Sequence, residues 1–147
     1  MVLVLGFKIA LLILVYMQSS TVHGQTLPTC RNIFPLIQNT GCHIIKTLTE
    51  LKHVVDTGIT SLVLCPGTIA KESSLERPLE VMTKLDIICK VPSKCVFRGG
   101  GSYIDVLLHS GQDHFSAHGI VFEGSTNSAV LVRTERSAAF CGCDFLG

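Results

Sequence analysis

The sequence predicts an all-β fold, a parallel β-helix that follows a single helix. Short runs rich in Val, Ile, Leu and Phe fill the chain from Ile59 onward, and Gly, Ser, Pro and Asn separate them, as expected for strands and turns. No second helical pattern intervenes, which argues against a sheet of alternating strands and helices. A Phe-x-Gly tripeptide returns about every two dozen residues, a period typical of stacked solenoid coils.

The repeated tripeptides predict an internal column of aromatic rings. Alternate residues of a strand face the same way, so Phe97, Phe122 and Phe145 occupy equivalent inward positions. The residues that follow them take the outward positions: Arg98, Glu123 and Leu146. A β-sandwich of short strands is the alternative fold, but it does not require Phe to recur at matching positions.

A second strand is expected after the Gly-rich turn of each coil. Ile104 and Val106 correspond in this register to Val130 and Val132 of the next coil. The residues predicted to point outward from these strands and their ends are Asp105, His109 and Arg133.

One amphipathic helix is predicted from about Thr47 to Asp56. Leu48, Leu51, Val54 and Val55 recur at helical spacing. Thr47 and Glu50 have the Ser/Thr-x-x-Glu form of a capping box, and Gly58 stands where a helix would stop. Because the helix precedes a region of strands alone, we expect it to cap the first coil.

The first residues have the pattern of a secretory signal peptide. Lys8 supplies the positive leader, the apolar run Ile9–Met17 follows, and Val22 and Gly24 stand at the −3 and −1 positions of a cleavage site. A membrane span is the alternative, but Gly6 and Lys8 interrupt a stretch shorter than the roughly 20 apolar residues it needs.

The predicted organisation is therefore a signal peptide over residues 1–24, an N-terminal segment with the capping helix over 25–58, and solenoid coils over 59–147. The mature chain is expected to be secreted, extracellular or in a cell wall, with no membrane attachment after cleavage. The formal net charge is +1 and the basic residues are scattered, so no nucleic-acid partner is expected.

The seven cysteines indicate disulfides, since exported proteins meet an oxidising environment. Cys89 and Cys95 flank a short loop and are the best predicted pair, and Cys30 with Cys42 is a plausible second pair. Cys95 and Cys143 lie two coils apart in one column, a separation of nearly 10 Å that exceeds the limit of about 7 Å between Cα atoms. The remaining cysteines are unassigned: Cys65, Cys141 and Cys143.

Two segments resemble the pectin-lyase-like superfamily of right-handed parallel β-helix proteins. The stretch from Asp56 to Ile69 is similar to the helix, first strand and Pro-Gly-Thr turn that open such proteins, and Phe115–Ser125 is similar to their Gly-Ile-x-Phe-x-Gly coils. The resemblance implies a right-handed solenoid with a capping helix and a relation to carbohydrates. The catalytic patterns of its polygalacturonases and pectate lyases do not occur in this sequence, and fold does not imply activity.

Five outward residues are candidates to face a ligand: Arg98, Asp105, His109, Glu123 and Arg133. The arginines could bind uronate or sulfate groups, and Asp105 with Glu123 could form the carboxylate pair of a glycosidase. Solvated surface charge is the simpler interpretation of all five. His114 and His118 are expected in turns or at the surface, so no metal site is predicted.

The leading hypothesis is a non-catalytic module that binds polysaccharide or has a structural role, without a cofactor. The alternative is the N-terminal part of a polysaccharide lyase or glycoside hydrolase whose catalytic coils lie beyond residue 147, and calcium is expected only for a lyase. The odd number of cysteines and an end inside a repeat suggest that the coils are incomplete at the C-terminus. A disulfide-linked assembly through Cys141 or Cys143 is a further possibility.

Overall fold

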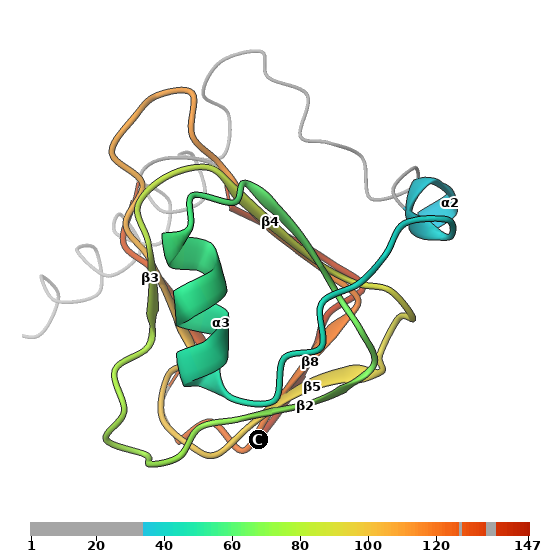
Figure 1. Cartoon of the computed structure of the whole chain (residues 1–147). Helices are drawn as coiled ribbons and strands as arrows, with labels where there is room; N and C mark the ends of the chain where they lie inside the picture. Colours follow the sequence, from blue (N-terminus) through green and yellow to red (C-terminus); the bar gives the residue numbers. More distant parts are fainter. Residues whose placement is uncertain (1–33, 127, 135–137) are drawn as a thin grey trace, which may run out of the picture.

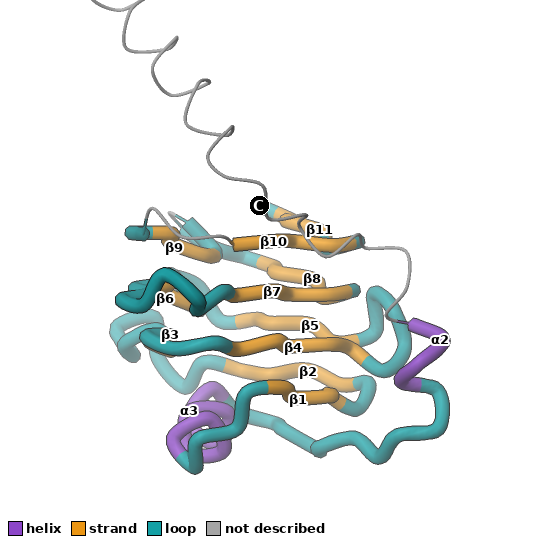
Figure 2. Tube along the Cα trace, turned by 90° about the horizontal axis from the view of Figure 1, so that it is seen from above, coloured by secondary structure: helices purple, strands orange, loops and turns teal. Residues whose placement is uncertain are grey.

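Parallel strands stack into a β-solenoid of about three turns. The structure is a computed structural model that describes residues 34–126, 128–134 and 138–147. Viewed along the stack, the coils outline a triangle, and the side view shows the strands lying above one another (Figures 1 and 2). The predicted signal peptide, residues 1–24, and Cys30 lie outside the described residues.

Each side of the triangle is one parallel sheet. The first sheet contains β1 (Ser61–Leu64), β4 (Leu85–Cys89), β7 (Phe115–His118) and β10 (Ala138–Cys141). The second sheet contains β2 (Gly67–Ala70), β5 (Cys95–Arg98), β8 (Ile120–Glu123) and β11 (Asp144–Leu146). The third sheet contains β3 (Leu79–Val81), β6 (Ile104–Val106) and β9 (Val130–Val132).

The predicted aromatic column is confirmed in the second sheet. Phe97 is in register with Phe122, and Phe122 with Phe145, while Ile69 occupies the same position one coil earlier. The ring centroids are 5.2 Å apart between Phe97 and Phe122 and 5.1 Å apart between Phe122 and Phe145. Phe97 and Phe122 are fully buried, whereas Phe145 at the end of the column is 53% exposed.

The predicted helix is α3, Leu48–Asp56, and Thr47 is its N-cap rather than its first residue. The Thr47 hydroxyl accepts the backbone N–H of Glu50, and the Glu50 carboxylate accepts the backbone N–H of Thr47, so the capping box is present. Leu48 and Leu51 are fully buried. The helix lies inside the triangular outline, at the β1 end of the stack (Figures 1 and 2). A short helix, α2 (Phe34–Ile37), precedes it.

The chain before α3 already runs alongside the first coil. His43 pairs with Leu64 and Thr47 with Ala70 as isolated parallel bridges. This pairing sets Cys42 beside Cys65, with Cα atoms 5.0 Å apart, and the two form a disulfide. The predicted bond between Cys30 and Cys42 is therefore wrong.

The other cysteines agree with the prediction that Cys95 and Cys143 do not pair with each other. Cys89 and Cys95 form the predicted disulfide, with Cα atoms 5.7 Å apart. Cys141 is also disulfide-bonded. Cys143 is the free cysteine among the described residues, so it does not pair with Cys95.

A Gly-rich corner lies beside the aromatic column and the buried Lys71. The Lys71 Nζ donates to the Ser102 carbonyl at 3.0 Å and lies 6.0 Å from the centroid of the Tyr103 ring. Gly99 has a φ of 130°, and a Cβ there would lie 2.9 Å from the Cβ and carbonyl oxygen of Lys71. Glycine is required at this position because both the backbone angle and the close approach exclude a side chain.

The contribution of each ring of the column to stability should depend strongly on how far that ring is buried. Replacing Phe122, which is fully buried, with Ala should lower the free energy of unfolding by about 3–5 kcal/mol, since it leaves a cavity between two rings. Urea unfolding measures this change. Phe145→Ala is the matched control, and an equal loss at this exposed position would contradict the stacked column.

Candidate functional site

The outward charges of the second sheet are paired with each other. Arg98 and Glu123 are register partners on β5 and β8. The Arg98 Nε and Nη2 both donate to the Glu123 Oε2, at 2.8 and 2.6 Å. The Arg98 side chain is 60% exposed and that of Glu123 38% exposed. Both point outward as predicted, but their charges are already matched.

Asp105 differs from its prediction as a surface charge. It lies on β6 in register between Glu80 and Leu131, and only 8% of it is exposed because neighbouring coils flank it on both sides. The Arg133 Nε approaches its Oδ1 to 3.2 Å, an ion pair without the alignment of a hydrogen bond. A buried carboxylate beside one arginine offers a ligand little access.

The predicted carboxylate pair is not assembled. Asp105 lies on β6 in the third sheet and Glu123 on β8 in the second, and each has its own arginine partner. His109, the fifth candidate, is exposed on the segment after β6. Within the described residues, the five candidates thus form two ion pairs, and His109 has no partner.

His114 and His118 belong to a polar chain on the first sheet. The His114 Nε2 lies 3.3 Å from the Asp86 Oδ1, the Ser116 hydroxyl donates to that same oxygen, and the His118 Nε2 lies 2.9 Å from the Ser116 Oγ. His118 is fully buried, which corrects its predicted place in a turn or at the surface. Across the described residues, no group of three or more His, Cys, Asp or Glu side chains could hold a metal ion.

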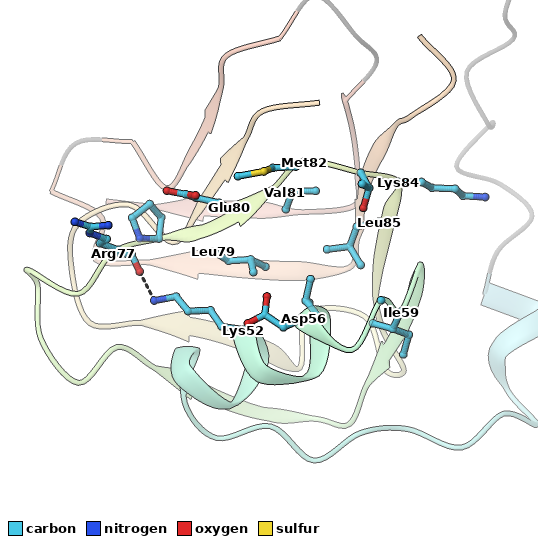
Figure 3. A pocket seen from close by; sticks show the side chains of 14 residues that line it. Lys52, Asp56, Ile59, Arg77, Leu79, Glu80, Val81, Met82, Lys84 and Leu85 are labelled. Carbon is cyan, nitrogen blue, oxygen red and sulfur yellow. Dashed lines mark hydrogen bonds between the residues drawn. The ribbon is translucent and has the colours of Figure 1, made fainter. Parts of the chain in front are cut away.

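A groove of about 440 Å³ lies between α3 and the segment that contains β3. Its apolar lining includes Leu79, Val81 and Leu85, which are buried. Figure 3 shows Lys52 reaching from α3 to the backbone of Arg77, where its Nζ donates to the carbonyl oxygen at 2.5 Å. The size lies within the range of small-ligand sites.

The charged residues of this groove differ from those of the coil faces. Arg77 and Lys84 lie at opposite ends of the view, and Asp56 lies between them (Figure 3). Within the part of the chain that the structure describes, the side chains of Asp56, Arg77, Glu80 and Lys84 make no ion pair or hydrogen bond. Their charges are therefore free to meet a ligand.

Sequence reasoning missed the groove because its two walls come from separate patterns. Lys52 and Asp56 are the polar residues of an ordinary amphipathic helix, and Arg77 to Leu85 is a turn followed by a short strand. Only the closing of the first coil brings α3 beside β3. No local motif marks that juxtaposition.

Comparisons of the chain with protein-family models, with curated proteins and with solved structures find no match. Among the described residues, none of the helices is long and apolar enough to cross a membrane.

The exposed ion pair of the second sheet should contribute little to stability. A double-mutant cycle with Arg98→Ala and Glu123→Ala should give a coupling energy of about 0.2–1 kcal/mol, because water screens both side chains. Urea unfolding of the wild type, the two single variants and the double variant measures it. A coupling of several kcal/mol would show that the pair holds the coils together.

Proposed function

We propose that this chain is a secreted module that binds polysaccharide without cleaving it, built on a right-handed β-helix of the pectin-lyase-like type that α3 caps. The observation that carries the proposal is the contrast between two sets of charges. On the coil faces Arg98 pairs with Glu123 and Arg133 with Asp105. Around the groove Lys52 pairs with Glu76, but the side chains of Asp56, Arg77, Glu80 and Lys84 have no partner among the described residues. Oxidised cysteines support an extracellular setting.

The groove suits an acidic saccharide. Arg77 and Lys84, at its two ends, would bind carboxylate or sulfate groups on separate sugar units, Arg77 by its planar fork. Asp56 and Glu80 would accept hydrogen bonds from sugar hydroxyls. The apolar floor formed by Leu79 and its neighbours would contact the C–H faces of the rings.

The carboxylates support binding rather than hydrolysis. Glycosidases use two carboxyl groups on either side of the scissile bond, and burial raises the pKa of the one that serves as the acid. Asp105 and Glu123 lie on different sheets, each with an arginine beside it. Asp56 and Glu80 are both exposed, so burial cannot prepare either of them for this role.

Removing the two free cations should weaken binding selectively. The double variant Arg77→Ala/Lys84→Ala should bind polygalacturonate or alginate at least about tenfold more weakly than the wild type, because two charge-assisted contacts are lost. Calorimetry at low and high salt measures the affinity, and added salt should weaken wild-type binding.

The matched control removes the paired charges of the coil face. Arg98→Ala/Glu123→Ala should retain wild-type affinity, since those side chains satisfy each other. Equal loss in both double variants, or equal binding by the variant and the wild type, would refute the groove as the site. New reducing ends, or unsaturated products in the presence of calcium, would show that the chain is an enzyme.

A further inference from the structure

The Glu76 side chain ties α3 to the loop between β2 and β3. From α3, the Thr49 hydroxyl donates to its Oε1 at 3.1 Å, and the Lys52 Nζ lies 3.4 Å from the same oxygen. From the loop, the Glu72 backbone N–H donates to its Oε2 at 3.0 Å. Both carboxylate oxygens are therefore engaged, and only 14% of the side chain is exposed.

These contacts hold Glu76 in its charged form. Burial favours the neutral acid, but the hydrogen bonds from Glu72, Thr49 and Lys52 outweigh it and lower the pKa of the Glu76 carboxyl from its ordinary value of 4.5. At neutral pH the carboxylate therefore attracts the Lys52 ammonium and fixes the end of that side chain beside the loop.

Lys52 extends this constraint to the backbone of Arg77. Its Nζ donates to the Arg77 carbonyl at 2.5 Å, the contact drawn in Figure 3. Pro78 follows, and a residue before proline is confined to extended backbone conformations. Leu79 then begins β3, where its N–H is bonded to the next coil. The backbone of Arg77 is thus restrained on both sides.

The Arg77 side chain itself is free at one end of the groove (Figure 3). It makes no ion pair or hydrogen bond with the rest of the described chain. Lys52 lines the groove as well, but the Glu76 carboxylate and the Arg77 carbonyl already engage its ammonium. A cation on a restrained backbone loses less conformational freedom on binding than one on a mobile loop.

We infer that Glu76 and Lys52 are positioning residues that hold Arg77 at the end of the groove for its ligand. This role rests on the proposed function, because Arg77 is there taken to contact an acidic saccharide. Glu76 and Lys52 act through Arg77 and make no contact of their own with the saccharide. Loss of either residue should therefore weaken binding only while Arg77 is present.

NMR relaxation tests the restraint without any ligand. The Arg77 N–H of the wild type should have an order parameter of about 0.85, as rigid backbone does, and this value should fall toward about 0.6 in Glu76→Ala and in Lys52→Met. The amides of β4 are the internal reference and should keep their wild-type values. A wild-type value below about 0.6, or an unchanged value in both variants, would overturn the restraint.

Calorimetry with polygalacturonate tests whether the positioning residues act through Arg77. Lys52→Met should bind about two- to tenfold more weakly than the wild type, because Arg77 must then be ordered on binding. Lys52→Arg should restore most of the affinity, since a guanidinium can donate to both the Glu76 carboxylate and the Arg77 carbonyl. In an Arg77→Ala chain, Lys52→Met should cause no further loss.

Lys90→Met is the matched control. The Lys90 Nζ donates to the Thr40 carbonyl at 2.8 Å, so this variant removes the same charge and the same kind of bond from a residue that does not line the groove. It should retain wild-type affinity. A loss equal to that of Lys52→Met, or a further loss from Lys52→Met in the Arg77→Ala chain, would refute the positioning role.

The two measurements separate this role from the proposed function. If the wild type binds no acidic polysaccharide, the proposed function is wrong, and the order parameters alone decide whether Glu76 and Lys52 fix Arg77. If the wild type binds and Lys52→Met binds equally well, the groove remains the site and the positioning role is wrong.

Discussion

Parallel, in-register pairing is the constraint on which the whole structure depends. Each strand residue lies over its equivalent in the next coil, at the strand spacing of about 4.8 Å, so an inward position that is apolar in one coil is expected to be apolar in its neighbours. Phe97 and Phe122 show the inward result, with ring centroids 5.2 Å apart. The same register aligns the outward-facing side chains of the coils, where it places Arg98 over Glu123 and Asp86 over Ser116.

The features predicted correctly from the sequence are those that such a register or a short segment determines. Phe122 could be assigned to the column because alternation along a strand and recurrence between coils agree. The capping box at Thr47 and the Cys89–Cys95 disulfide are local, because each joins residues only a few positions apart. The periodic recurrence is therefore sufficient to predict the column, and short-range rules are sufficient to predict the capping box and this disulfide.

The features that sequence reasoning missed depend on contacts between distant segments. Cys42 lies beside Cys65 because the chain before α3 pairs with the first coil. The spacing of the cysteines in the sequence does not predict that pairing. Asp105 and His118 are both buried, and each lies on a strand that has a neighbouring coil on either side, which alternation along a single strand does not specify. The groove likewise requires α3 to lie against β3, which a periodic pattern along one segment does not specify.

The three sheets keep their register although the coils differ in length. Successive register partners on the first sheet are Ser61, Asp86, Ser116 and Ala139, so the coils contain 25, 30 and 23 residues. The surplus is accommodated at the corners, where the chain leaves one sheet before it enters the next. Architecture and loop length are therefore uncoupled, and the corners are positions where evolution or an engineer could graft new recognition loops without disturbing the stack.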